Sequence, residues 1–349
     1  MLVVGLGQMG KSHCLAYHGN PEFEIVGLCS RSIMDQTDLP AEFFGYQRYS
    51  DFDQALRECR PDGVCICTWP DTHYIYAKKA LMAGAHVFLE KPIAETVAQA
   101  EEVVKLAKEA GLKLVVGYIL RHHPSWIQFV ELARTLGKPL VMRMNLNQQS
   151  SGNSWRIHKK LMESVSPIVD CGVHYLDIMC QMSGAGPVRV HAVGVRLSEE
   201  IADDMYNYGH LHVVFDDGSV GWYEAGWGPM VSETSFFIKD VFGPRGSVSI
   251  TGSVGSESDN VDSHTVVNRL HRHFAETDES GEFIRKDIII NSEDEPDHLQ
   301  LCAREQAYFL TSIRENLDLS NHWRDGINSL RVVLAADESI RQGRVVDLT

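Results

Sequence analysis

Residues 2–18 read LVVGLGQMGKSHCLAYH, and this stretch decides the fold. An apolar run, Leu2 to Val4, is followed by glycines in the spacing G-x-G-x-x-G and by a helix-like stretch over Gln8 to His18. Such glycines permit a tight turn, a close approach of backbone to a pyrophosphate, and close packing of helix on strand. The stretch predicts a strand, turn and helix that bind a dinucleotide through Gly5, Gly7, Gln8, Met9 and Gly10.

Short apolar runs and amphipathic stretches continue to alternate as far as Gly117. Further strands are expected over Glu24 to Cys29, Gly63 to Cys67, His86 to Leu89 and Leu114 to Val116. Helices are expected between them, over Thr72 to Ala83 and Thr96 to Ala110. Strands that alternate with helices are typical of a doubly wound parallel sheet, so residues 1–120 are predicted to form an α/β domain of the Rossmann type.

Beyond Arg121 the pattern changes to that of a largely antiparallel sheet. Strands are expected over Leu140 to Leu146, Val188 to Val195, His210 to Phe215, Val220 to Tyr223 and Ser247 to Thr251. Asp216, Asp217 and Gly218 have the chemistry of a hairpin turn, and Gly243 to Gly246 resembles a second one. Helices are expected after Pro124 and over Ile168 to Met182, His298 to Glu315 and Gly326 to Arg341. Residues 121–349 are thus predicted to form an α+β domain with a large, mostly antiparallel open sheet, whose C-terminal helix packs back on the first domain.

Composition excludes several classes of protein. The chain has 349 residues with 32 Lys plus Arg and 47 Asp plus Glu, a formal charge of −15, which disfavours nucleic acid and anionic membranes as partners. Eight cysteines show neither metal-finger spacing nor disulfide density, so they are expected to be reduced and no metal site is predicted. We find no apolar run of membrane-spanning length and no signal-peptide pattern, and therefore expect a cytoplasmic protein.

The residues after the second predicted strand favour NADP over NAD. An acid that would bind both ribose hydroxyls of NAD is expected about 20 residues beyond the glycines, but the sequence there contains Ser30 and Arg31. A hydroxyl and a guanidinium suit the 2′-phosphate of NADP. The alternative is that Arg31 faces solvent and Asp35 binds the ribose, which would leave NAD as the cofactor.

Five motifs together make the chain resemble the Gfo/Idh/MocA family, named after glucose-fructose oxidoreductase, inositol dehydrogenase and a rhizopine-catabolism protein. They are the glycine loop, T-W-P-D-T-H at 68–73, E-K-P at 90–92, G-Y-x-x-R at 117–121 and D-x-G-x-H-x-x-D at 170–177. The resemblance covers essentially the whole chain. It implies an NAD(P)-dependent dehydrogenase or reductase that acts on a secondary alcohol of a sugar, cyclitol or sugar derivative, and that forms a homodimer or homotetramer through its open sheet.

The expected catalytic residues are Lys91, Asp170 and His174. Asp170 and His174 are four residues apart on a predicted helix and so share one face, where a carboxylate can orient an imidazole. Lys91 ends a parallel strand, where ligands of open α/β sheets bind. The resemblance implies that all three surround the substrate hydroxyl. His174 is expected to act as acid and base and Lys91 to polarise the oxygen, although the two roles could be exchanged; Asp177 could join them or form a structural ion pair.

Further site residues are expected mainly from the resemblance. Those expected to bind the cofactor are Thr68, Pro70, His73, Glu90, Lys91, Trp155 and Arg156. Those expected to bind substrate are Lys91, Tyr118, Arg121, His123, Asp170 and His174. The pairs His210 with His212 and His271 with His273 are interpreted as surface or interface histidines, because a metal site would need further ligands.

Two other functions fit the same sequence. Some relatives of the family are glycosidases that oxidise a sugar transiently with retained nicotinamide, and a repressor that resembles the family binds cofactor without dehydrogenase activity. The presence of Lys91, Asp170 and His174 argues against a non-catalytic regulator.

Overall fold

The structure, a computed structural model, describes residues 1–36, 39–232, 238–251, 265, 267–292 and 295–348. The chain forms two compact units. Unit 1 consists of Met1–His122 and Pro296–Ile327, and unit 2 of His123–Glu295 and Asn328–Thr349. Residues 296–327 belong to unit 1 because α8 (His298–Arg314) and the first part of α9 (Ser320–Gln342) pack there. For example, the Trp323 indole donates to Leu114 O at 2.7 Å.

Unit 1 contains a parallel sheet whose strands, in the described residues, lie in the order β3-β2-β1-β4-β5-β6. The strands are β1 (Leu2–Val4), β2 (Gly27–Cys29), β3 (Arg48–Tyr49), β4 (Gly63–Ile66), β5 (His86–Leu89) and β6 (Leu114–Val116). Most of their side chains are fully buried, as expected for parallel strands covered on both faces. The order reverses between β1 and β4, where doubly wound sheets bind their ligands.

The helices of unit 1 begin where local sequence favours it. They are α1 (Gln8–His18), α2 (Phe52–Cys59), α3 (Pro70–Met82), α4 (Val97–Glu109) and α8, with short 3-10 turns at Ala41–Phe43 and Ile119–His122. Asp51 caps α2 by accepting from Gln54 N at 2.7 Å, and Thr96 caps α4 by accepting from Gln99 N at 3.2 Å. The expected strand over 24–29 is shorter than predicted, because a turn from Asn20 to Phe23 precedes it and pairing with β1 begins at Gly27.

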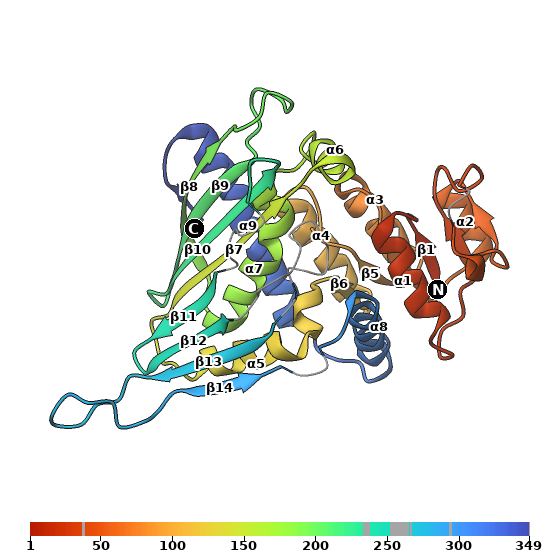
Figure 1. The fold of residues 1–349 in the computed structure, drawn as a ribbon. Coiled ribbons are helices and arrows are strands. Elements are labelled where there is room, and N and C mark those ends of the chain that lie inside the picture. The colour runs from red at the N-terminus through yellow and green to blue at the C-terminus, as the bar shows by residue number, and fades with distance from the viewer. Residues whose placement is uncertain (37–38, 233–237, 252–264, 266, 293–294, 349) are drawn as a thin grey trace. The chain divides into compact units, whose positions relative to one another are not determined.

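Unit 2 contains a sheet whose described strands lie in the order β14-β13-β12-β11-β7-β10-β9-β8-β15 (Figure 1). The strands are β7 (Val141–Gln149), β8 (Pro187–Val195), β9 (Tyr208–Phe215), β10 (Val220–Gly228), β11 (Lys239–Gly243), β12 (Gly246–Thr251), β13 (Arg269–Phe274), β14 (Ile288–Asn291) and β15 (Val346–Asp347). Neighbours are antiparallel except for β7 and β10, which are parallel. Gly218, in the turn between β9 and β10, has φ +81°. The predicted fold class, a Rossmann domain plus a mostly antiparallel sheet domain, is confirmed.

Unit 2 buries one face of its sheet under helices. These are α5 (Pro124–Arg134), α6 (Gly152–Leu161), α7 (Pro167–Ser183) and the part of α9 from Asn328 onward. Helix α7 is buried almost throughout, and Gly172 lets it pack closely: a Cβ there would lie 3.0 Å from Val333 of α9 and 3.1 Å from Tyr223 of β10. In the described residues, no helix combines the length and apolar character needed to cross a membrane.

Candidate active site

The glycine loop of unit 1 can be built only from glycine at two positions. Gly5 has φ +85°, and a Cβ there would lie 2.4 Å from the carbonyl oxygen of Cys67. A Cβ at Gly10 would lie 1.8 Å from the carbonyl oxygen of Gly5. Because glycine has no Cβ, the backbone of the turn between β1 and α1 can lie directly against the end of β4.

Gly7, the second glycine, has open space where a side chain would be, because no described atom beyond its two chain neighbours lies within 4 Å of the position that a Cβ would occupy. It is also the N-cap of α1, and among the described residues no side-chain hydrogen bond caps this helix end. Gln8 is exposed and Met9 is partly exposed at the start of the helix. Backbone N–H groups at a helix N-terminus attract phosphate through hydrogen bonds and the helix dipole. These features fit the pyrophosphate of a dinucleotide.

The end of β2 presents the residues that are expected to read the ribose. Ser30 is held to β3 because its N–H donates to Tyr49 O at 3.0 Å, and Arg31 and Asp35 follow it as exposed residues in a run of turns. The structure adds a residue that the sequence did not indicate. Gln36 Nε2 donates to Leu6 O in the glycine loop at 3.1 Å, so it ties this turn to the loop.

Thr68, Pro70 and His73 follow β4. Pro70 is the first residue of α3, and Thr72 Oγ1 donates to Thr68 Oγ1 at 2.7 Å. His73 is fully buried, with Nδ1 2.7 Å from Pro92 O and Nε2 3.0 Å from Thr68 O. Burial lowers the pKa of His73, while the two carbonyl contacts act in the opposite direction. His73 therefore connects the segment after β4 with the segment after β5.

Behind the glycine loop lies a buried polar network that the sequence did not indicate. His13 of α1 has Nε2 2.8 Å from Glu90 Oε1, and its Nδ1 lies 2.8 Å from Gln306 Nε2 of α8. Burial opposes charge on the imidazole, but the hydrogen bond to Glu90 outweighs it and raises the pKa of His13 to about 9. The Tyr17 hydroxyl donates to Gln306 Oε1 and extends the network.

Glu305 lies beside this network with both carboxyl oxygens buried and without hydrogen-bond partners among the described residues. Its side chain is 1% exposed, and burial raises its pKa to about 8, so it is protonated at neutral pH. Ligand atoms of His13, Cys302 and Glu305 lie within 4.8 Å of one another. Both nitrogens of His13 are already engaged by Glu90 and Gln306, so we describe the group as a packed polar cluster.

Lys91 is the second residue after β5 and is partly exposed. Its backbone N–H donates to Glu90 Oε2 at 3.2 Å, and the Lys91-Pro92 peptide is cis. Burial opposes ionisation of Glu90, yet the His13 hydrogen bond and charge lower the pKa of this carboxyl, so it is ionised. The carboxylate before Lys91 thus holds the lysine backbone, while the lysine occupies the carboxyl end of the strand next to β4.

The residues expected near the second domain each have structural contacts. Tyr118 is buried and its hydroxyl lies 3.4 Å from Gly326 O, while Arg121 Nη2 lies 3.4 Å from Asp325 Oδ2, all within unit 1. His123, in unit 2, is buried and its Nε2 lies 2.8 Å from Glu295 Oε2. Each of the three side chains thus has a polar contact within its own unit, and their expected contact with substrate stays a prediction.

Asp170 and His174 lie one turn apart on α7 in unit 2. The helix starts with Ser166 as its cap, which accepts from Val169 N at 3.1 Å, and Pro167 at its first position. Asp170 is partly exposed and His174 is buried to 8% exposure. Asp177, one turn further, is buried and accepts from Gln181 Nε2 at 2.9 Å; its participation in the site stays a prediction.

Asp170 has a polar and aromatic surrounding. Cys171 Sγ lies 3.7 Å from Asp170 Oδ2 and 3.7 Å from Gln148 Oε1, which also accepts from the Trp227 indole at 2.8 Å. His158 stacks on Trp227 with ring centroids 4.3 Å apart, and burial lowers its pKa to about 4 although Asp170 acts in the opposite direction. His158 is therefore a neutral neighbour of the Asp170 carboxylate, which the sequence did not indicate.

Trp155 and Arg156 lie on α6 in unit 2. The Trp155 indole donates to Glu200 Oε1 at 3.1 Å, and Arg156 donates to Asn153 on the exposed side of the same helix.

The histidines of β13 contact a carboxylate, because Asp287 accepts from His271 Nε2 and His273 Nδ1 at 2.8 Å each. The structure thus brings together the expected residues within each unit: the glycine loop with Thr68, His73, Glu90 and Lys91, and separately Asp170 with His174.

The fold and the glycine loop are those of a dinucleotide-binding oxidoreductase, and comparison with family models agrees. Residues 1–118 match the oxidoreductase family with an NAD-binding Rossmann fold, and residues 132–256 match the GFO/IDH/MocA C-terminal domain. The chain therefore belongs to the Gfo/Idh/MocA oxidoreductase family, which confirms the resemblance. An NAD-binding Rossmann domain supports a nicotinamide cofactor, without distinguishing NAD from NADP.

Curated relatives and solved structures are similar to the chain. It is 29% identical to UDP-N-acetylglucosamine 3-dehydrogenase of Acidithiobacillus ferrooxidans over 201 residues, which cover 58% of the chain and 59% of that protein. It is 29% identical to D-glucoside 3-dehydrogenase of Escherichia coli over 195 residues, or 54% of each. The chain thus spans little more than half the length of these relatives. An NAD binding oxidoreductase from Klebsiella pneumoniae has the same fold, with TM-score 0.79 and 21% identity over 100% of this chain and 98% of that one.

Proposed function

We propose that the protein is an NAD(P)-dependent dehydrogenase or reductase that acts on a secondary alcohol of a sugar, cyclitol or sugar derivative. The observation that carries the proposal is the glycine loop: Gly5 and Gly10 cannot bear a side chain, whereas Gly7 faces open space at an uncapped helix end. The similar proteins named above are dehydrogenases of UDP-N-acetylglucosamine and of D-glucosides, which supports a sugar-like substrate.

The chain's own residues supply acid-base chemistry to this reaction. When bound, nicotinamide supplies the carbon that exchanges hydride with the alcohol carbon. Lys91 polarises the substrate oxygen with its ammonium group, His174 takes the hydroxyl proton during oxidation and returns it during reduction, and Asp170 orients the imidazole. His73 and Glu90 hold the segments that carry Thr68 and Lys91, because their hydrogen bonds connect these segments to each other and to α1.

We propose NADP as the preferred cofactor, bound at its 2′-phosphate by Ser30 and Arg31. Arg31 is exposed at the end of β2, and none of the described residues pairs with its guanidinium. A guanidinium offers paired donors that suit a phosphate. Asp35 lies in the same run of turns and is the residue that would bind the ribose if NAD were preferred.

We further propose that the protein forms a homo-oligomer through the open face of the unit 2 sheet. Val193 and Val195 on β8 and Val220 on β10 are exposed large apolar side chains there. Burying such a surface against a second copy would be favourable. Light scattering on the purified protein should give a mass of two or four chains; the mass of a single chain at micromolar concentration would contradict this.

A panel assay tests the proposed activity. Purified protein is mixed with NADP⁺ or NAD⁺ and with single sugars, cyclitols, sugar acids and glycosides, and reduced nicotinamide and oxidised product are both quantified. We expect at least one substrate to give equal amounts of reduced nicotinamide and oxidised product. Its kcat/KM should be higher with NADP⁺ than with NAD⁺. Glycoside cleavage without net reduced nicotinamide would indicate redox-assisted hydrolysis instead, and cofactor binding without turnover of any substrate would indicate a regulator.

A further inference from the structure

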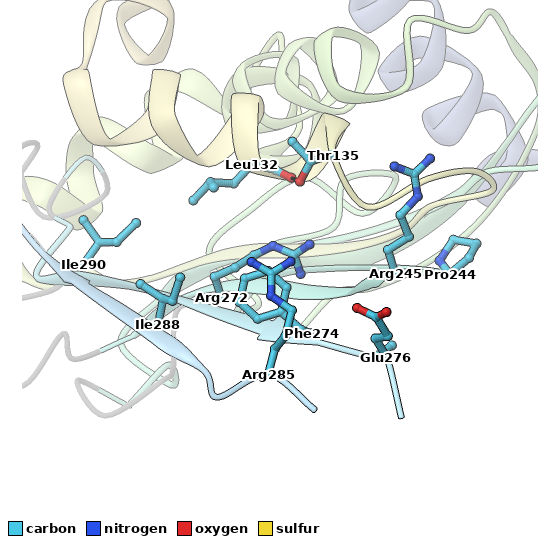
Figure 2. Close-up of a pocket in the computed structure, with 11 residues that line it drawn as sticks. Leu132, Thr135, Pro244, Arg245, Arg272, Phe274, Glu276, Arg285, Ile288 and Ile290 are labelled. Carbon is cyan, nitrogen blue, oxygen red and sulfur yellow. Dashed lines mark hydrogen bonds between the residues drawn. The ribbon is translucent and has the colours of Figure 1, made fainter. Parts of the chain in front are cut away.

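A cavity of about 570 Å³ lies in unit 2, between α5 and the edge of the sheet formed by β13 and β14 (Figure 2). Its described lining includes Arg245, Arg272 and Arg285, with Glu276 as the single carboxylate. Figure 2 shows Arg272, Phe274 and Arg285 grouped together, with Arg245 and Glu276 on one side of them and Ile288 and Ile290 on the other. The cavity takes no part in the function proposed above.

Arg272 occupies a position where the strand pattern calls for an apolar residue. Alternate residues of β13 face the same side, and Leu270 on that side is fully buried. Arg272 is 5% exposed, and its Nη1 donates to the backbone oxygens of Ser247 and His273. Burial, and secondly the nearby Arg285, lower the pKa of this guanidinium. Carbonyl groups satisfy some of its donors but leave its positive charge without a counter-charge.

Arg285 lies against the same group of side chains. Its guanidinium carbon is 3.8 Å from the centroid of the Phe274 ring, and that of Arg272 is 4.5 Å from it. Stacking on an aromatic ring orients a guanidinium while leaving its N–H edge available to bind an anion. Among the described residues, no carboxylate forms an ion pair with Arg245, Arg272 or Arg285.

The other end of the cavity is apolar. Leu132 of α5 and Ile288 and Ile290 of β14 line it, and Ile288 is directly opposite Arg272 in the pairing of β13 with β14. Ile288 is exposed, as is expected for a side chain that borders an open cavity. A ligand that fits this lining has an anionic head and a small apolar body.

We propose that this cavity is a binding site for a small organic anion, in which the guanidinium groups of Arg245, Arg272 and Arg285 hold a phosphate or carboxylate head and Leu132, Ile288 and Ile290 contact an apolar body. Paired N–H groups of arginine match the oxygens of both heads. Arg272, Arg285 and the isoleucines lie outside residues 1–118 and 132–256, the parts matched by the two family models. The site is separate from the glycine loop, which is in unit 1.

Calorimetric titration of the full chain tests the proposal. The probes are phenyl phosphate and benzoate, which carry the two heads on one apolar body, and benzyl alcohol as the neutral control. Saturating NADP⁺ is present throughout, so that the glycine loop does not contribute. We expect at least one of the two anions to bind saturably, with one molecule per chain, and added NaCl to weaken this binding. Benzyl alcohol should not bind.

Variants locate the binding. Arg285→Ala removes an exposed guanidinium and should weaken binding of the anion at least tenfold. Arg272→Met should also weaken binding at least tenfold, and its apolar side chain fills the buried position of the arginine stem. Arg269→Ala is the matched control, because Arg269 is an exposed arginine at the start of the same strand and does not line the cavity. If neither anion binds, or if Arg285→Ala binds as tightly as Arg269→Ala, the proposal is wrong. Should Arg272→Met fail to fold, the comparison of Arg285→Ala with Arg269→Ala still decides.

Discussion

Glu90 Oε1 lies 2.8 Å from His13 Nε2, and this contact joins the residue before Lys91 to the helix that begins in the glycine loop. His13 is one turn inside α1, and Glu90 directly follows β5. The pair therefore couples the proposed phosphate-binding helix to the proposed catalytic lysine through buried side chains. Because the Gln306 amide contacts the other nitrogen of His13, α8 supports the same arrangement from behind.

Replacing Glu90 with alanine should destabilise unit 1 and displace Lys91. The change leaves His13 buried without its acceptor and removes the oxygen that accepts from Lys91 N. We expect the free energy of unfolding to fall by about 2–4 kcal/mol in urea denaturation, as for a broken buried pair. Glu90→Gln retains an acceptor and the shape, so it should cost less. Equal losses for the two variants would show that the contact with His13 is unimportant.

Glu305 should make the protein less stable as pH rises. Burial raises its folded pKa to about 8, above the ordinary value of 4.5, so between these pH values the folded state binds more protons than the unfolded state. Its contribution to stability is complete below pH 4.5 and is lost as pH rises through about 8. The slope is at most about 1.4 kcal/mol per pH unit.

The Glu305→Gln variant isolates this effect, because glutamine has the same shape and does not titrate. Subtracting its free energy of unfolding from that of the parent protein at each pH removes the contributions of the other titratable groups. The parent should lose stability relative to Glu305→Gln between about pH 5 and pH 8.5. A constant difference over that range would mean that Glu305 is ionised in the folded protein.

Lys239 should have the opposite dependence. Its side chain is buried on β11, and burial lowers its pKa well below the usual value, so the folded state binds fewer protons than the unfolded state. Stability is therefore lost as pH falls. Lys239→Met should raise the free energy of unfolding at neutral pH by about 1–4 kcal/mol, as replacement of buried charge by an apolar side chain can do. The gain should be larger at about pH 6 than at about pH 9; a gain that does not vary with pH would contradict the assignment.

Arg31→Ala tests the choice of cofactor. Removing the guanidinium should weaken NADP⁺ binding about tenfold to a hundredfold, the range for loss of a hydrogen bond to a charged group, and leave NAD⁺ nearly unchanged. Fluorescence titration of both cofactors measures the two dissociation constants. Asp35→Ala is the control, and it should affect neither cofactor strongly. Equal weakening of both cofactors by Arg31→Ala would refute the role assigned to Arg31.

The sequence predicts the parallel sheet well because its strands are buried on both faces. Leu2–Val4, Gly63–Ile66 and Leu114–Val116 are continuous apolar runs, which need no knowledge of their neighbours to be recognised. The glycine spacing adds the first turn. By contrast, β3 has two residues and depends on pairing with β2, and the expected strand from Glu24 was too long because the turn at Asn20 precedes it.

Some strands of unit 2 and some contacts near the site depend on long-range packing, and these could not be predicted from the sequence. Arg272 interrupts the apolar side of β13, which hides that strand from a period-two pattern, and β15 is a strand of two residues, Val346 and Asp347, that depends on pairing with β8. The contact of His13 with Glu90 joins residues 77 apart, and no local pattern signals it. That Asp170 and His174 share one helix could be predicted, because they are four residues apart within a single helical stretch; their role in catalysis stays a prediction.

The most direct test of the proposed function is the single-turnover rate of nicotinamide reduction, measured with saturating cofactor and the best substrate of the panel. It is compared among the parent protein, Lys91→Met, His174→Asn and the double variant. We predict a loss of at least about a hundredfold in each single variant, cofactor dissociation constants changed less than about threefold, and a loss in the double variant smaller than the product of the two. If both single variants reduce the cofactor at the parental rate, Lys91 and His174 do not carry the reaction.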